Sequence, residues 1–491
     1  MLDEARHFFG KEQVKKVLDL MARYKMNRFH WHLADNQGWR VEIKAYPQLA
    51  AVGGVGCLSN RKAPARFYTQ DEIREIVKKA NQLKALGLPI HWENIGDPIE
   101  KKCQVPEWIK DIVVSLAKEN RSYGYCPSQG VLATREFLAN ETNKLGGVQI
   151  TPNDILFFNG LGDAIATIYG LLAMTTRIIG PSPAYSTHSS AEASHAHTVP
   201  ITYSLMPENH WYPDLEELEN KVKYNPSISG ILILNPDNPT GMVYPLEILK
   251  KIVDIAKRYN LFIICDEIYN KITYNGARAY ALAEYIGDVP GIALKGISKE
   301  YPWPGSRCGW AEYYNRDKDE QFDAFCRAID NAKMIEVCST TLPQLTIPKV
   351  LGDPRFMEHR KALNEKIGRR SAIINEILGD IPELYFNPTY GAFYNTIIFR
   401  EGALNDRQFL PIENPEIKAK VEEWCASTTN LDYRFVYYLL GAKGICVVPS
   451  TSFCTDLKGF RVTLLEEDED ELRHVFTEIH DAIISYLASA K

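Results

Sequence analysis

The chain has 491 residues, of which 45% are hydrophobic and 24% charged, a composition typical of a globular protein with a large buried core. The net charge of -6 is spread along the sequence without a basic block, which disfavours a nucleic-acid partner and favours a small-molecule ligand. The first residues lack the regions of a signal peptide, the longest apolar stretch is too short for a membrane span, and the ten cysteines form no CxxC pair. We therefore expect a cytoplasmic protein with unpaired thiols.

Residues 1 to 75 have a character of their own. A helix is predicted from Lys11 to Tyr24, and the aromatic and histidine-rich run Asn27 to Arg40 follows it. These segments, with Ala5 to Phe9 before them and Phe67 to Ile73 after them, resemble the start of the catalytic barrel of family 20 β-N-acetylhexosaminidases. The resemblance implies that Arg6 would hold a sugar hydroxyl.

Catalysis is not expected from this N-terminal fragment. The sequence lacks the His-x-Gly-Gly-Asp-Glu segment that carries the Asp-Glu pair of that family. About two βα units cannot close an eight-stranded barrel. His30 and His32 form an HxH pair without a third ligand nearby, so no metal site is predicted. We expect an incomplete βα-barrel-like appendage, joined to the rest of the chain by gene fusion.

From Thr151 to about Trp310, short apolar runs alternate with amphipathic stretches. The predicted strands lie at residues 155–158, 177–179, 230–234, 261–265 and 292–294, with predicted helices at 164–172 and 246–259. Continuous apolar runs are typical of strands that are covered on both faces, and intervening helices indicate a mostly parallel sheet. The fold class is therefore α/β.

Three polar residues follow these apolar runs. Asn238 comes after residues 231–234, Asp266 after 261–265, and Lys299 after 292–294. Ligands of open α/β sheets bind at the carboxyl ends of the strands, so these three side chains are expected to share a site. Beyond Asn315 the pattern becomes helical, and a second α+β region ends in a helix from Asp468 to Ala490.

These residues carry a family resemblance. From about Glu72 onward the chain resembles a class I/II aminotransferase of the fold type I pyridoxal phosphate-dependent enzymes, on the segments Asn238-Pro239-Thr240-Gly241, Asp266-Glu267-Ile268-Tyr269 and Ser298-Lys299 to Arg307. The resemblance implies a large domain with a mostly parallel sheet and a smaller α+β domain. It places the small domain at 76–123 and 346–491 and the large domain at 124–345.

The resemblance implies pyridoxal 5'-phosphate (PLP) as cofactor and gives each residue a role. Lys299 would bind the aldehyde covalently and later move a proton at the substrate α-carbon. Asp266 would hold the ring nitrogen, and Asn238 and Tyr269 the phenolic oxygen. Tyr185 would stack on the ring. The phosphate would be held by the following residues: Leu161, Gly162, Ser298, Arg307 and, from a neighbouring subunit, Tyr125.

The substrate is expected to contact Arg461, Gly96 and Asn238. Arg461, in Gly459-Phe460-Arg461, matches the arginine that binds the α-carboxylate in this family. The resemblance therefore implies a homodimeric enzyme that moves an amino group between an L-amino acid and a 2-oxo acid by a ping-pong mechanism. It predicts neither a nucleic-acid nor a membrane partner.

Two alternatives stay open at this point. The same cofactor residues serve PLP-dependent lyases and decarboxylases, and the sequence does not identify the amino donor. A different class is a catalytically degenerate carbohydrate-binding or scaffold protein, in which the N-terminal fragment matters. The presence of the lysine, the aspartate and both arginines favours the enzyme.

Overall fold

The computed structural model describes residues 2–3, 31–32, 34–35, 38–39 and 75–490. The chain forms two compact units, Met1–Pro89 and Ile90–Lys491. The described residues of the first unit form two strand pairs, parallel β1 (Leu2–Asp3) with β2 (Trp31–His32) and antiparallel β3 (Ala34–Asp35) with β4 (Gly38–Trp39), and the helix α3 (Glu75–Ala85). Arg6 and His30, and most of the predicted hexosaminidase-like fragment, lie outside the described residues.

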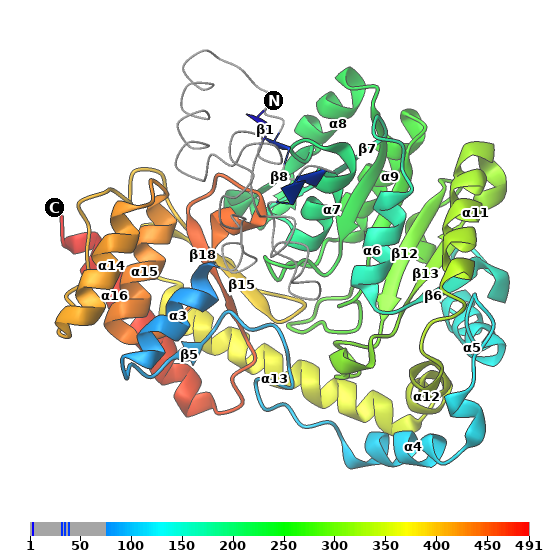
Figure 1. Ribbon diagram of the computed structural model, residues 1–491, viewed down its shortest axis with the longest axis horizontal. Coiled ribbons are helices and arrows are strands. Elements are labelled where there is room, and N and C mark those ends of the chain that lie inside the picture. The colour runs from blue at the N-terminus through cyan, green and yellow to red at the C-terminus, as the bar shows by residue number, and fades with distance from the viewer. Residues whose placement is uncertain (1, 4–30, 33, 36–37, 40–74, 491) are drawn as a thin grey trace. The chain divides into compact units, whose positions relative to one another are not determined.

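The second unit is built on an eight-stranded sheet in the order β6-β13-β12-β11-β10-β7-β8-β9 (Figure 1). Neighbours from β12 to β8 are parallel, while β13 and β9 run antiparallel to their neighbours, so the sheet is mixed. The strand bounds are β6 (Ile155–Phe158), β7 (Arg177–Ser182), β8 (Thr202–Met206), β9 (Tyr212–Pro213), β10 (Ile228–Leu234), β11 (Phe262–Asp266), β12 (Gly291–Gly296) and β13 (Gly309–Tyr314).

Helices cover both faces of this main sheet, as the apolar strands require. One face packs against α6 (Leu161–Gly170) and α11 (Glu320–Ile335), with α7 (Ser186–Ala196) beside them. The other packs against α4 (Glu107–Ala117), α5 (Leu132–Asn143), α8 (Leu215–Tyr224), α9 (Leu246–Arg258), α10 (Leu282–Tyr285) and α12 (Thr341–Leu351). Successive strand residues alternate between the two faces: Ile263 and Cys265 face one core, and Ile264 the other.

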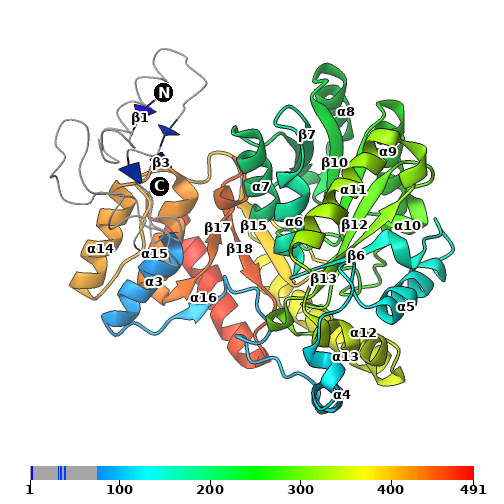
Figure 2. The same cartoon turned by 45° about the vertical axis from the view of Figure 1, so that its right-hand side comes forward.

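A second, smaller sheet is antiparallel, in the order β14-β15-β18-β17 (Figure 2). Its strands are β14 (Leu384–Tyr385), β15 (Tyr394–Phe399), β17 (Val448–Pro449) and β18 (Gly459–Thr463). The accompanying helices are α13 (Pro354–Leu378), α14 (Pro415–Ala426), α15 (Leu431–Lys443) and α16 (Glu469–Ala488). β5 (His91–Trp92) pairs in parallel with β16 (Ile445–Cys446), so the segment after residue 90 lies beside the C-terminal region.

The elements predicted from residue 155 onward agree with the observed ones within a few residues, and the helix predicted from Lys11 to Tyr24 lies outside the described residues. The helix expected at 164–172 is α6, which begins earlier because Gly160 adopts a positive φ of 88° and starts the helix at Leu161. The α/β class and the mostly parallel main sheet are confirmed. The domain boundaries at residues 76, 124 and 346 stay predictions.

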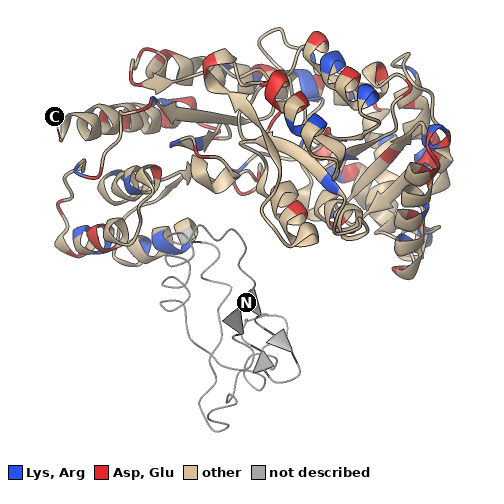
Figure 3. Ribbon diagram, turned by 90° about the horizontal axis from the view of Figure 1, so that it is seen from above, with Lys and Arg blue, Asp and Glu red and all other residues tan. Residues whose placement is uncertain are grey.

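Charged residues of both signs are mixed along the second unit (Figure 3). This distribution agrees with the net charge of -6 and offers no single-sign stripe in the described part of the chain. No helix among the described residues is long and apolar enough to cross a membrane.

A tight turn follows β10 and presents Asn238. The Asp237 backbone amide donates to the Met242 carbonyl at 2.9 Å, and the Gly241 amide donates to the Asp237 carbonyl at 3.0 Å. The Asp237 carboxylate accepts bonds from the backbone and hydroxyl of Thr240. Its other oxygen is buried without a partner, and burial raises the pKa of Asp237 to about 7 against the bonds from Thr240.

Asp237 should therefore make the apoprotein less stable as the pH rises. The folded protein holds a proton on this acid that the unfolded chain has released between about pH 4 and pH 7, so the free energy of unfolding falls across that range. At about 1.4 kcal/mol per pKa unit, the loss is on the order of 4 kcal/mol. In urea unfolding, Asp237→Asn should lack this part of the pH dependence, while Asp254→Asn, an exposed change on α9, should keep it. Equal slopes in all three proteins would contradict the assignment.

Candidate active site

The predicted site residues meet at one edge of the main sheet. β10, β11 and β12 are adjacent and parallel, so their carboxyl ends lie side by side. Asn238 follows β10, Asp266 is the last residue of β11, and Lys299 follows β12. Three residues far apart in sequence are thereby brought to the edge where ligands of α/β sheets bind.

Asp266 is 5% exposed and pairs with a histidine that the sequence analysis did not single out. His188 of α7 places Nε2 3.1 Å from Asp266 Oδ2, and the Ile268 backbone amide donates to Oδ1 at 3.0 Å. His188 is fully buried, and its Nδ1 has no hydrogen-bond partner. The pair fixes the orientation of the carboxyl group at the end of β11.

Lys299 extends from the loop after β12 toward a partner near the start of the second unit. Its Nζ donates to the Gly96 carbonyl at 2.8 Å. The same nitrogen lies 5.6 Å from the ring centre of Phe393 and 5.9 Å from that of Tyr269. Lys299 and Gly96, both predicted site residues, are in direct contact.

Tyr269 is buried between aromatic neighbours. Its hydroxyl lies 3.1 Å from the Tyr394 hydroxyl, and its ring meets those of Phe393 and Tyr394 edge-on. Burial raises the pKa of Tyr269 well above its ordinary value, which keeps this hydroxyl a proton donor. A Cβ added at Gly96 would come 2.1 Å from the Tyr394 hydroxyl, so this glycine permits the close approach.

Arg461 is a buried cation on β18 without an ion pair among the described residues. One of its terminal nitrogens lies 3.3 Å from Asn238 Oδ1, and the other donates to the Asn94 carbonyl at 2.9 Å. Its Nε has no partner, and burial lowers the pKa of its guanidinium. Because a buried charge is costly without a counter-ion, this position is suited to an anionic ligand.

A second set of donors lies at the start of α6. The first amides of a helix have no partners within it, and here they belong to Leu161 and Gly162. Arg307 lies beside them: a Cβ added at Gly160 would come 2.6 Å from its guanidinium. Ser298 is half-buried in the loop before Lys299. A helix N-terminus beside an arginine is suited to a phosphate.

The two predicted tyrosines differ in their surroundings. Tyr185 immediately precedes α7 and meets the ring of His188 edge-on, with 6.4 Å between ring centres. Tyr125 is 87% exposed in the single chain, so its side chain makes little contact with the rest of the unit.

Sequence reasoning missed His188, Phe393 and Tyr394. His188 had a usable signal, since it lies three residues after Tyr185 at the start of a helix, on the same face. Phe393 and Tyr394 had none, because they come from β15 and the residue before it, more than 120 residues beyond Tyr269 in the chain.

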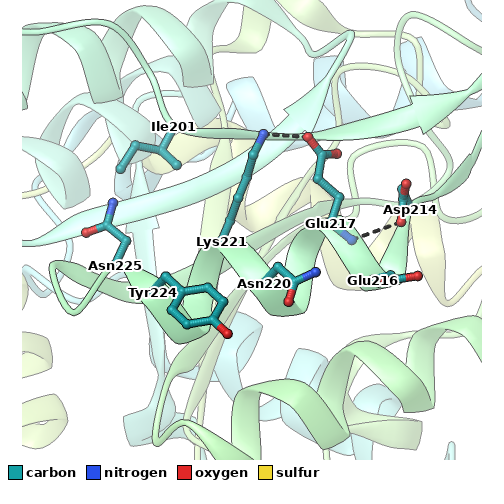
Figure 4. Close-up of a pocket in the computed structure, with 8 residues that line it drawn as sticks. All are labelled: Ile201, Asp214, Glu216, Glu217, Asn220, Lys221, Tyr224 and Asn225. Carbon is teal, nitrogen blue, oxygen red and sulfur yellow. Dashed lines mark hydrogen bonds and ion pairs between the residues drawn. The ribbon is translucent and has the colours of Figure 1, made fainter.

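A shallow hollow lies elsewhere, beside α8 (Figure 4). It has a volume of about 740 Å³ and is lined mainly by α8 side chains. Lys221 pairs with Glu217 at 2.6 Å, and Asp214 accepts a bond from the Glu217 backbone amide at 2.9 Å. None of the residues that line the hollow belongs to the predicted site.

Comparison with known proteins decides the family. The sequence pattern of aminotransferase class I and II matches residues 94–479. The chain belongs to this aminotransferase family. An uncharacterized aminotransferase of Methanocaldococcus jannaschii is 53% identical over 416 residues, covering 85% of this chain and 96% of that protein. The glutamate-pyruvate aminotransferase AlaA of Escherichia coli strain K12 is 30% identical over 310 residues, covering 62% of this chain and 75% of that protein.

A solved structure agrees with the fold of this aminotransferase. The alanine aminotransferase from Pyrococcus furiosus superimposes with a TM-score of 0.73 at 26% identity, covering 84% of this chain and 97% of that one. The fold type I assignment is confirmed, and membership of the family implies PLP as cofactor.

The N-terminal resemblance is confirmed as well. The catalytic domain of glycosyl hydrolase family 20 matches residues 1–134, further than the predicted end near residue 75. The two matches overlap at residues 94–134, where α4 packs into the core of the aminotransferase unit. Gene fusion stays a prediction.

Proposed function

We propose that this aminotransferase moves the amino group of L-alanine, or of a similarly small L-amino acid, to a 2-oxo acid in two successive half-reactions. The observation that carries the proposal is the buried Arg461, which lies beside Asn238 and the rings of Tyr394 and Phe453 and forms no ion pair with any described residue. Each part of the site supplies one requirement of that reaction.

The residues at the sheet edge fit PLP. Asp266, backed by His188, would hold the ring nitrogen, since a buried acid stabilises a protonated pyridine. Asn238 and Tyr269 would bind the phenolic oxygen, and Tyr185 would cover the ring. Leu161, Gly162, Ser298 and Arg307 form a donor set suited to the phosphate.

When bound, PLP supplies an aldehyde that takes up the amino group and a ring that draws electrons from the substrate α-carbon. Lys299 would hold the cofactor through its amine. With its amine free, Lys299 would act as a general acid and base that moves the proton at the substrate α-carbon.

Arg461 would orient the substrate. Its planar guanidinium carries several N–H donors and has no carboxylate partner among the described residues, so a substrate α-carboxylate would supply the missing counter-ion. The asparagines at 94 and 238 hold the guanidinium in place from either side. The α-carbon would then lie on the same side of the site as Lys299.

The aromatic walls favour a small side chain. The Arg461 guanidinium lies 4.5 Å from the ring centre of Tyr394 and 4.9 Å from that of Phe453. Tyr394 is also held by Tyr269, so it cannot easily move aside. Two of the relatives named above also support a small substrate, since one is a glutamate-pyruvate aminotransferase and the other an alanine aminotransferase.

The proposal is tested by a single half-reaction. With holoenzyme and L-alanine alone, we expect the absorbance of the cofactor to change to that of its amino form, with one pyruvate released per site and no ammonia. Added 2-oxoglutarate should restore the first spectrum. L-phenylalanine should react poorly. Pyruvate formed over many turnovers together with ammonia would indicate a lyase, and carbon dioxide release a decarboxylase; either would contradict the proposal.

The Arg461→Leu variant provides a control in the same assay. Loss of a charge-assisted bond to the substrate should lower kcat/KM by about 10-fold to 100-fold, while the spectrum of the bound cofactor stays unchanged.

We propose further that the protein forms a homodimer through an exposed apolar surface. Tyr123, Tyr125 and Ile335 are 78%, 87% and 87% exposed. The segment with the two tyrosines lies beside the start of α12, because Thr341 donates to the Gly124 carbonyl at 2.8 Å, and Ile335 lies six residues before Thr341 in the chain. Large exposed apolar and aromatic groups in one place are typical of protein interfaces. In a dimer, Tyr125 would reach the partner's phosphate site.

The dimer is tested by analytical ultracentrifugation. The native protein should sediment as a dimer, and Ile335→Asp should shift it toward monomer because a carboxylate would be buried at the interface. Tyr224→Asp, a similar change at a residue 74% exposed on α8, should remain dimeric. A monomeric native protein would contradict this proposal.

A further inference from the structure

A polar cavity of about 210 Å³ lies behind the catalytic residues, and the mechanism above does not use it. Its walls include Glu267, Asn270, Lys295 and Glu300 from the main sheet and its loops, and Arg360 from α13. α5 supplies apolar and polar residues to the same cavity.

The cavity is linked to the active site through the backbone. Glu267, Asn270 and Glu300 are the immediate sequence neighbours of Asp266, Tyr269 and Lys299. Adjacent residues at a strand end point to opposite faces, so Asp266 faces His188 while Glu267 faces Lys295. Any ligand held by these neighbours therefore acts on the segments that carry the catalytic groups.

One ion pair in the cavity wall is complete without a ligand. Lys295 Nζ lies 2.8 Å from Glu312 Oε2, and Glu312 also accepts bonds from Trp310 at 3.0 Å and Tyr314 at 2.6 Å. Burial lowers the pKa of Lys295, but Glu312 and Glu267 outweigh it and raise the pKa overall. The Glu312 carboxylate is therefore satisfied by protein groups and needs no ligand.

Three other side chains in the wall each keep one buried atom without a hydrogen-bond partner among the described residues. Glu267 is 3% exposed; its Oε1 accepts the Leu282 backbone amide, while its Oε2 accepts no hydrogen bond and lies 3.6 Å from Lys295. Glu300 Oε2 and Asn270 Nδ2 are buried without partners. Burial raises the pKa of both glutamates against the nearby cations. Unmet buried polar atoms of this kind are costly, and native proteins satisfy them with water or a ligand.

These three atoms define a ligand chemistry. Glu300 Oε2, and Glu267 Oε2 in addition to its ion pair with Lys295, can each accept a bond from a positively charged donor, and the Asn270 amide requires an acceptor. Lys271 and Arg360, which also line the cavity, add positive charge on that side. In the part of the chain that the structure describes, no three His, Cys, Asp or Glu side chains are placed to hold a metal ion, so an organic cation suits the site better.

We propose that this cavity binds a free α-amino acid as an effector, with its ammonium group between Glu267 and Glu300 and its carboxylate toward Asn270 and Arg360. Through Glu300 and Glu267, the bound effector shifts the positions of Lys299 and Asp266, so its binding and substrate binding influence each other. The binding itself does not rest on the proposed reaction.

Equilibrium dialysis with radiolabelled L-alanine and L-glutamate tests the site. The full-length Arg461→Leu protein is used because its active site should bind a carboxylate more weakly. We expect one of these amino acids to bind once per chain. Glu300→Gln should weaken that binding by about tenfold or more, the loss expected for a hydrogen bond to a charged group. Glu358→Gln, the same change at an exposed position of α13, should leave it unaffected.

Asn270→Asp gives a second, independent variant. It replaces the unpaired donor by a carboxylate, so it should also weaken binding, and it guards against a folding defect specific to Glu300→Gln. Absence of binding to Arg461→Leu, or binding that both cavity variants leave unchanged, would overturn the proposal. A protein that fails to transaminate L-alanine but still binds it in this assay would refute the proposed reaction and keep the effector site.

Discussion

The site depends on a single constraint: β10, β11 and β12 are adjacent and parallel, so the residues that follow them lie at one edge of the sheet. That edge brings Asn238, Asp266 and Lys299 together although they span more than 60 residues of sequence. The apolar cores on both faces fix the strands, and the strands fix the polar groups at their ends. The polar side chains of the site are therefore positioned by the packing of apolar residues that take no part in the reaction.

The polar groups that the sheet brings together are subject to a further requirement, which is that a buried charge needs compensation. Asp266 has His188 as its partner, whereas Arg461 has only amide and carbonyl oxygens. Behind them, Lys295 is matched by Glu312, but Glu300 is unmatched. A protein does not retain such groups for stability, because apolar replacements cost less. The two unmatched charges point to two different ligands, one anionic at Arg461 and one cationic at Glu300.

Much of this arrangement could be predicted from the sequence. The strands were readable because runs such as 261–265 and 292–294 are continuously apolar, and that pattern also placed Asp266 and Lys299 at strand ends. The resemblance supplied Arg461 and Gly96, which no local pattern would have singled out. Contacts that depend on distant segments could not be predicted: Tyr269 with Tyr394 crosses 125 residues, and Lys299 with Gly96 crosses 203. The cavity was missed because it needs Lys295 and Glu312 on neighbouring strands, where charges are rare. The roles of the site residues stay predictions.

The most direct measurement locates the cofactor's covalent bond. The protein is incubated with PLP, reduced with borohydride and digested, and the peptides are analysed by mass spectrometry. We expect one stable pyridoxyl phosphate adduct per chain, on Lys299, and none on Lys295, four residues away on β12. An adduct on another lysine, or a protein that takes up no cofactor, would contradict the account.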